Sequence, residues 1–240
     1  MKGFGHLLDE SYKSFKEHFL LFVKITFVLY FLPRTILEII TRFIPNIFLR
    51  FGISIYNSLI IWLLHLLIIF TVIKVLLIKK KEKEISFSQA LTEGSKHYGE
   101  GIILSVIMQL ALFGLFLLFV IPAVIYGVYW SFAYYALITD NVGVTKALAH
   151  SKKVVEGRWW KVLGINSLFY LMLFALLIPL YFVLNLFFGL VNFVIPHLQF
   201  VYDILMIIID SGIFMFVIPF SLIFMAKFYL DLKKSTKNLD

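Results

Sequence analysis

The sequence contains no cysteine, and this absence removes several classes of site at once. Without a thiol, the 240-residue chain can form no disulfide, use no thiolate nucleophile and hold no cysteine-ligated zinc or iron–sulfur cluster. Charge is also scarce, because 15% of the residues are Asp, Glu, Lys or Arg, against about a quarter in a typical soluble domain. The composition therefore argues against a chain that is surrounded by water.

Recognisable catalytic patterns are missing as well. The sequence has no H-E-x-x-H, G-x-S-x-G, Walker A or G-x-G-x-x-G pattern. Its six histidines are dispersed without the paired spacing of a metal site, and we interpret His6, His18, His97 and His150 as solvated or headgroup-facing side chains. We therefore expect no catalytic residue, no cofactor and no metal, and a protein that is not an enzyme.

Long apolar runs dominate what is present. Apolar residues make up 61% of the chain, and the mean hydropathy is +0.95. A span needs about 20 mostly apolar residues, and lipid accepts helices or closed barrels; these runs are too long and too uniformly apolar for barrel strands. We predict an all-α, polytopic membrane bundle, a single integral membrane domain over 1–240 with a short tail at 231–240. Its six transmembrane helices lie at about 17–32, 53–78, 101–120, 122–139, 160–184 and 204–230.

Prolines mark positions where these helices should break or bend. Pro122 divides the apolar stretch 101–139 into two spans, because a proline removes a helical hydrogen bond and clashes with the preceding turn. Pro179 and Pro219 lie inside the last two spans, where we expect kinks.

The basic residues predict the orientation. Lys and Arg are retained on the cytoplasmic side of a membrane, so both termini should be cytoplasmic, and the +8 net charge needs no nucleic-acid partner. On the opposite side lie Arg34, Arg42 and Arg50. With Glu38, the first two are spaced by four and predict a short surface helix. The predicted cytoplasmic segments hold 17 of the 22 basic residues: Lys2, Lys13, Lys16, Lys79, Lys80, Lys81, Lys83, Lys96, Lys146, Lys152, Lys153, Arg158, Lys161, Lys227, Lys233, Lys234 and Lys237.

A threefold pattern precedes the odd-numbered spans. Three segments align without gaps at offsets of 83 and 57 residues, each with apolar residues on one helical face, a small residue at its centre and a lysine on the polar side. The pattern predicts three amphipathic interfacial helices and three units of helix plus hairpin, at about 1–78, 79–139 and 140–230. Any three amphipathic helices beside spans would also look alike. The aligned sets are Phe4, Leu7, Leu8, Ser11, Lys13 and Phe15; Phe87, Ala90, Leu91, Gly94, Lys96 and Tyr98; Val144, Ala147, Leu148, Ser151, Lys153 and Val155.

Ionisable residues inside spans are the first candidates for a functional site, because each costs several kcal/mol, about 2.5 to 3.5 on insertion scales, unless it is paired or hydrated. We single out Lys24, His65 and Asp210. Lys24 can extend to the interface. His65 and Asp210 could meet if the second and sixth spans are neighbours. Such a pair could serve a proton or ion path, and a structural hydrogen bond would explain it equally well.

A second set of candidates could contact lipid headgroups. Basic residues near an anionic surface contribute about 1 kcal/mol each, and tryptophans favour the interface. The KKKEKE run at 79–84 is either a solvated loop or a further attraction to anionic lipid. The candidate headgroup contacts are Lys96, Lys152, Lys153, Arg158, Trp159 and Trp160.

The stretch 141–165 carries a family resemblance. It contains the A-L-x-x-S of Ala147, Leu148 and Ser151, Gly157 before the pair Trp159 and Trp160, and a Leu-Gly at 163–164. These features resemble the six-span domain of YciC-type inner-membrane proteins and of the membrane part of some glycerophosphoryl diester phosphodiesterases, best over about 85–178. The resemblance implies a prokaryotic cytoplasmic-membrane protein. The catalytic domain of the phosphodiesterases is not part of this sequence, so their hydrolytic activity is not carried over.

Three classes of function remain open. The first is a non-enzymatic, lipid-associated scaffold or envelope-maintenance factor, whose partners are anionic lipids at the cytoplasmic face. The second is a small transporter or channel with an intramembrane polar site near Asp210, because internal repetition is common in transporters. The third is a membrane-embedded enzyme that modifies lipid. A homo-oligomer or an association with other membrane proteins is compatible with each.

Overall fold

A computed structural model describes residues 2–78 and 85–237, and in these ranges the chain is helical and has no strand. The KKKEKE run at 79–84 lies outside the described residues. Six helical segments are long and apolar enough to cross a membrane, which confirms the prediction of an all-α, multi-pass membrane protein. They are Phe19–Arg42 (α2 Phe19–Thr26, a π-helical turn Phe27–Phe31 and α3 Leu32–Arg42), Ile47–Leu77 (α4), Tyr98–Leu118 (α6), Val120–Thr139 (α7 Val120–Trp130 and α8 Ala133–Thr139), Trp159–Val194 (α10) and Gln199–Thr236 within α11 (Gln199–Lys237).

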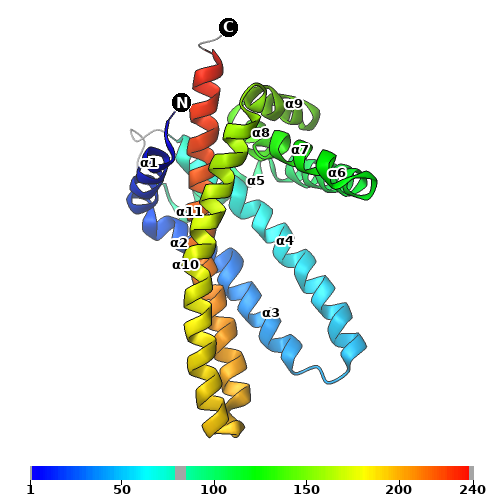
Figure 1. Ribbon diagram of the computed structural model, residues 1–240, viewed down its shortest axis with the longest axis vertical. Coiled ribbons are helices and arrows are strands. Elements are labelled where there is room, and N and C mark those ends of the chain that lie inside the picture. The colour runs from blue at the N-terminus through cyan, green and yellow to red at the C-terminus, as the bar shows by residue number, and fades with distance from the viewer. Residues whose placement is uncertain (1, 79–84, 238–240) are drawn as a thin grey trace.

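Two helical hairpins give the molecule its long axis (Figure 1). The helices α10 and α11 form the longer hairpin, closed by a 3-10 turn at Pro196–Leu198; α2–α3 and α4 form the second, closed at 43–46. Both chain termini lie at one end of this axis, which we call the terminal end, and both of these connections point toward the opposite end, which we call the loop end.

Three short helices lie at the terminal end: α1 (Phe4–Glu17), α5 (Phe87–Ser95) and α9 (Val144–Val155). They coincide with the three predicted amphipathic segments. Each short helix is followed by a long helix, and the residue just before that long helix is His18, His97 or Arg158, with φ of −114°, −105° and −132° and ψ of 25°, 10° and 14°. Descent of these helices from one repeated unit stays a prediction.

The inner faces of the short helices are buried as the pattern requires. Leu7, Ala90 and Ala147, which occupy one aligned position, are fully buried. At the central small position, Ser11 and Ser151 are fully buried, and Gly94 lies directly against the backbone of Thr71 in α4. Small residues at these positions let helices approach closely, as they do at membrane-helix contacts.

Several boundaries differ from those predicted. The first span does not end near residue 32 but continues through α3 to Arg42, so the predicted surface helix is wrong. Arg34 and Glu38 neutralise each other within α3, which allows the segment to remain in the bundle. The next helix, α4, begins at Ile47, capped by the Asn46 side chain, and α10 extends ten residues further than expected, to Val194.

The prolines act mostly as expected. The chain breaks at Phe119, with φ −159° and ψ 141°, and Pro122 stands in the first turn of α7, where its missing N–H costs little. Pro179 and Pro219 lie within α10 and α11, which continue as helices on both sides of them; the kinks at these positions stay a prediction.

The aromatic core lies at the terminal end. Phe22, Phe132, Phe169 and Phe224 are fully buried, and the rings of Phe169 and Phe224 stack with centroids 4.1 Å apart. The most apolar part of α10 has no buried residue. Packing is thus concentrated near the termini, and the helices toward the loop end are less covered by one another.

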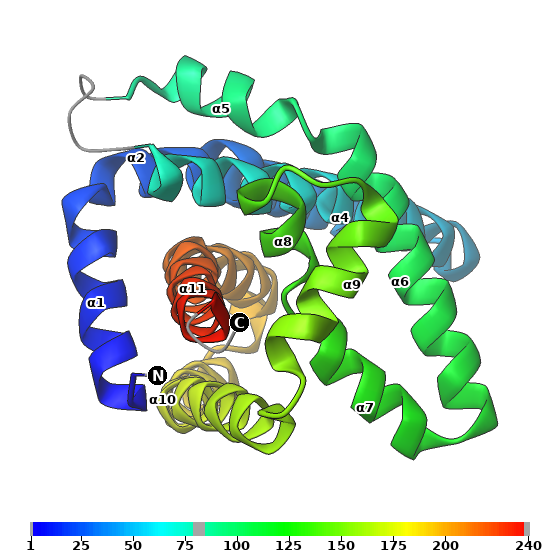
Figure 2. The ribbon, with the colours of Figure 1, turned by 90° about the horizontal axis from the view of Figure 1, so that it is seen from above.

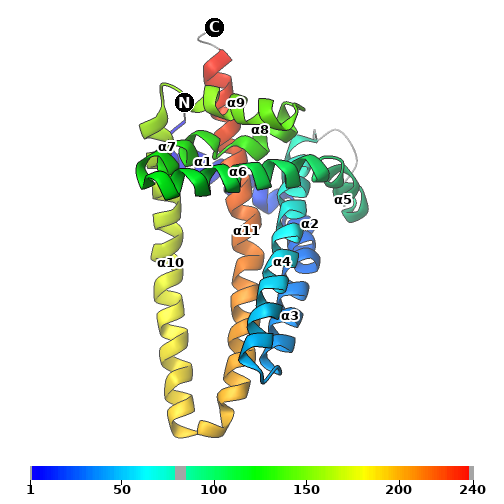
Figure 3. The same ribbon diagram turned by 90° about the vertical axis from the view of Figure 1, so that its right-hand side faces the viewer.

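The hairpin of α6 and α7 runs in a different direction from the two long hairpins. Viewed from above, α10 and α11 are seen nearly end-on, whereas α6 and α7 are seen along their length (Figure 2). From the side, α6 and α7 lie across the molecule at the level of α1, with α9 above them (Figure 3).

Candidate functional site

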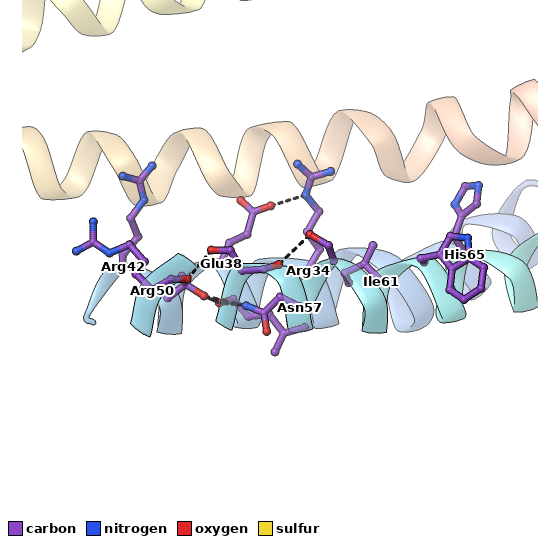
Figure 4. A pocket seen from close by; sticks show the side chains of 12 residues that line it. Arg34, Glu38, Arg42, Arg50, Asn57, Ile61 and His65 are labelled. Atoms are coloured by element: carbon purple, nitrogen blue, oxygen red, sulfur yellow. Dashed lines mark hydrogen bonds and ion pairs between the residues drawn. The ribbon is translucent and has the colours of Figure 1, made fainter. Parts of the chain in front are cut away.

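A polar cavity of about 680 Å³ lies between α3 and α4, in the part of the molecule toward the loop end (Figure 4). Three arginines and a glutamate line it, together with small polar residues, one histidine and three apolar side chains. The lining residues are Arg34, Leu37, Glu38, Thr41, Arg42, Arg50, Ser54, Asn57, Ser58, Ile61, Trp62 and His65.

Helical spacing places these side chains on two facing stripes. On α3, Arg34, Glu38 and Arg42 recur every four residues; on α4, the stripe runs from Arg50 to His65, about 22 Å at 1.5 Å per residue. Asn57 links the two helices, because its Nδ2 donates to Thr41 Oγ1 at 2.8 Å and to the Leu37 carbonyl at 3.3 Å. The cavity is therefore a long groove with Arg42 and Arg50 at one end, Arg34 between the ends and His65 at the other end.

Arg34 is the centre of a network that joins three long segments. Its Nε donates to Glu38 Oε1 at 2.8 Å and its Nη2 donates to Asp210 Oδ2 in α11 at 2.6 Å. Its Nη1 donates to the Tyr30 hydroxyl, and Tyr181 of α10 donates its hydroxyl hydrogen to the other oxygen of Asp210. Asp210 thus ties α10 and α11 to the first span.

The other two arginines differ in how far their charge is balanced. Arg42 is half exposed, and its Nη1 lies 3.5 Å from Asp203 Oδ2. Arg50 donates its Nε and Nη2 to the Ile44 carbonyl, at 2.9 and 2.6 Å. Within residues 2–78 and 85–237 no carboxylate pairs with Arg50. Its charge is thus the least compensated of the three, and its Nη1 remains for a ligand.

The structure joins none of the three predicted intramembrane residues to another. Asp210 pairs with Arg34 and Tyr181, not with His65, because the Arg34 guanidinium occupies the carboxylate oxygen. His65 is half-buried at the end of the cavity, and it has no hydrogen-bond partner in the described part of the chain. Lys24 is exposed on α2, with its Nζ 5.7 Å from the ring centroid of Phe87.

The predicted headgroup contacts divide into two groups. Lys152, Lys153 and Trp160 are exposed on and beside α9, and Lys96 pairs with Glu93 at the surface. The other two are turned inward. Arg158 donates to Ser235 Oγ at 2.7 Å and holds the end of α11, and Trp159 Nε1 donates to the Ile125 carbonyl at 3.2 Å.

Sequence reasoning missed a second polar cluster, centred on Asp140 at the end of α8. Its side chain is 8% exposed. One oxygen accepts from His150 Nδ1 and from the Tyr229 hydroxyl, each at 2.9 Å, and the other accepts from Thr139 Oγ1 at 2.8 Å and from Lys233. A carboxylate just past an apolar run was the available signal, although solvent exposure explains it equally well.

The Asp140 cluster predicts a pH-dependent stability. Burial raises the pKa of this carboxyl, but hydrogen bonds from Lys233, His150, Thr139 and Tyr229 outweigh that effect and bring it below the usual 3.8. A lowered folded-state pKa gives stability that is present above about pH 4 and is lost as the pH falls through the folded-state value. D140N should lower stability at pH 7 by about 2 kcal/mol, because an amide cannot accept all four donors. The unfolding temperature of D140N should also fall less steeply than that of the unmodified chain as the pH is lowered below about 4. If the unfolding temperatures of D140N and of the unmodified chain fall equally steeply below about pH 4, Asp140 is not the source of the acid sensitivity.

Neither a metal site nor a known relative adds to this description. In the described ranges no three His, Asp or Glu side chains are grouped so that they could hold a metal ion. Comparisons of the chain with protein-family models, with curated proteins and with solved structures gave no match.

Proposed function

We propose that the protein is a non-enzymatic, multi-pass membrane protein that binds an anionic lipid in the cavity between α3 and α4. The observation that supports this most is Arg50, a guanidinium at one end of the cavity that has no carboxylate partner in the described chain. A guanidinium recognises phosphate and carboxylate groups through paired N–H donors. An anionic headgroup is the ligand that would neutralise the Arg50 guanidinium.

The remaining lining favours an amphiphile over a free anion. Leu37, Ile61 and Trp62 line the cavity between the arginine end and His65. Ligand sites typically combine such apolar walls with a few polar groups that fix orientation. A headgroup beside Arg42 and Arg50, with an acyl chain along Leu37 and Ile61, would use both kinds of surface.

In this proposal both termini are cytoplasmic and the cavity lies toward the outer side of a cytoplasmic membrane, and the charge bias of the sequence supports this orientation. Exposed basic residues on α9 would then add a weaker attraction to the inner leaflet. A protein that contacts lipid at both faces fits a scaffold or envelope-maintenance role. We also propose that the chain is a YciC-type protein and that its three helix-plus-hairpin units arose from one repeated unit. The equivalent buried positions in the three short helices support the repeat.

Replacing Arg50 by glutamine tests the site. Loss of a charge-assisted contact costs about 1.5 to 3 kcal/mol, so the affinity of the purified protein for phosphatidylglycerol should fall about 10- to 100-fold. Binding is measured by titration in detergent, with phosphatidylcholine as the neutral comparison. R50K retains the charge but not the paired N–H donors, so its affinity should lie between those of R50Q and the unmodified chain.

The double variant K152Q/K153Q is the matched control for Arg50. It removes two positive charges from α9 at the terminal end and should leave most of the measured affinity unchanged. Equal affinity of R50Q and the unmodified chain would refute the cavity as the lipid site. A large loss of affinity in K152Q/K153Q alone would show that the lipid binds at the basic helix α9 and not in the cavity.

A transporter is the second candidate, because the cavity reaches Arg34 and through it Asp210. Paired ionisable residues within a membrane often mark a substrate or proton path. R34L/D210L removes this pair without leaving either charge alone. It should abolish anion uptake into proteoliposomes if the protein is a transporter, and it should preserve lipid binding at Arg50 if it is not.

A further inference from the structure

We infer that the hairpin of α6 and α7 lies within one leaflet of the membrane, surrounded by acyl chains, while α10 and α11 cross it. Length and apolar composition alone would allow this hairpin to cross. Its direction argues otherwise, because it runs across the axis that α10 and α11 share (Figures 2 and 3). If that axis follows the membrane normal, α6 and α7 lie along the membrane plane.

The surface of the hairpin fits hydrocarbon, not headgroups. A helix among headgroups has a polar face, but residues 110–125 include no polar side chain. Apolar side chains are exposed along both helices and through the turn between them. They include Ile103, Val106, Ile107, Leu110, Phe113, Phe116, Leu117, Leu118, Phe119, Val120, Ile121 and Val124.

The neighbouring helix α9 sets the depth. Its buried face, with Ala147 and Val155, packs on α6, α7 and α8, while Lys146 and Lys152 are exposed. Ser151 Oγ donates to the Tyr129 carbonyl of α7 at 2.6 Å. Packed helices lie about 8–10 Å apart, and one leaflet has about 15 Å of hydrocarbon. An α9 at the interface therefore places α6 and α7 inside that leaflet.

The turn is adapted to lipid in its backbone as well. The Phe119 N–H donates to the Leu115 carbonyl at 2.9 Å, and Pro122 has no N–H to leave unpaired in the first turn of α7. Each unpaired backbone group in hydrocarbon costs several kcal/mol, so both features favour a turn away from water. A hairpin returns to its starting side whether or not it crosses, so the lysine distribution is satisfied by either arrangement.

Single cysteines can locate the hairpin, because the natural chain has none. F119C, at the turn, should resist a membrane-impermeant maleimide from both sides of intact vesicles and react after detergent is added. H197C, in the α10–α11 connection, should react from one side and K234C from the other. Reaction of F119C from the same side as H197C would show that α6 and α7 cross, and would overturn the inference.

Nitroxide labels at I103C, L110C and L117C give a second measurement that does not depend on the turn. All three residues are exposed, and their spacing of seven places them on one face of α6. An in-plane helix puts the labels at one depth, whereas a crossing helix separates successive labels by about 10 Å. Comparing collisions with oxygen and with a water-soluble nickel chelate reports the depth. Graded depths would overturn the inference, and so would exclusion of oxygen from all three sites, since a second protein copy would then cover the face.

Discussion

Replacing Gly94 by leucine is expected to push α5 away from α4 and to destabilise the terminal end of the protein. A Cβ at this position would lie 2.4 Å from Thr71 Oγ1 and 2.8 Å from both the N and the Cα of Thr71. The Thr71 hydroxyl could rotate, but its backbone atoms lie within the continuous helix α4 and cannot. Overfilling a packed interior typically costs about 1–3 kcal/mol. We expect the lower part of that range for G94A and about 3 kcal/mol or more for G94L.

Glycine 114 provides the matched control. It also lies inside a helix, α6, but a Cβ there would meet nothing within 4 Å. G114A should therefore be neutral or stabilising by about 0.5–1 kcal/mol, because alanine is the better helix former. Thermal unfolding in detergent measures both, with about 2–4 °C expected per kcal/mol for a chain of this size. If G94A unfolds at the same temperature as G114A, the close contact between α4 and α5 is not present.

The close approach at Gly94 could be predicted from the sequence because it depends on local periodicity. Apolar spacing placed Gly94 at the centre of an amphipathic face, and a small residue there predicts close approach of another helix. The six apolar segments were predictable for a related reason, since lipid leaves few alternatives to a long helix. Both inferences need only the order of residues along a single segment.

The cavity could not be predicted in the same way. Arg34, Glu38 and Arg42 recur every four residues, and that spacing describes a surface helix as well as it describes the wall of a polar groove. What decides between them is Asp210, which is 176 residues from Arg34 in the chain. Helical period fixes which face a residue occupies but not which distant helix lies opposite. The expectation that Asp210 would meet His65 failed for this reason.

The direction of α6 and α7 could not be predicted from the sequence either. A run of about 20 apolar residues fits a path through the bilayer, and an equally apolar run fits a path along one leaflet if an amphipathic helix shields it from water. The shielding helix α9 lies 24 residues after Val120, so composition alone gives no indication that it covers the hairpin. The Asp140 cluster was missed similarly, because Lys233 and Tyr229 come from α11.

Removing Arg34 is expected to have the second large effect, and a larger one than removing its partner. R34L leaves Asp210 at membrane depth with the Tyr181 hydroxyl as its remaining partner among the contacts described. D210L leaves Arg34 with both Glu38 and Tyr30. Breaking a buried ion pair costs about 3–5 kcal/mol, but both side chains here are about one-quarter exposed. We therefore expect about 3 kcal/mol for R34L and about 1–2 kcal/mol for D210L.

The double variant R34L/D210L distinguishes a coupled pair from two independent losses. With both charges gone, neither is left without a partner, so the double variant should unfold at a higher temperature than R34L. The coupling energy, the difference between the double loss and the sum of the single losses, should be at least about 1 kcal/mol. Strictly additive losses would mean that Arg34 and Asp210 do not interact. In that case other contacts between α3 and α11, and not the Arg34–Asp210 pair, would hold the first span against α11.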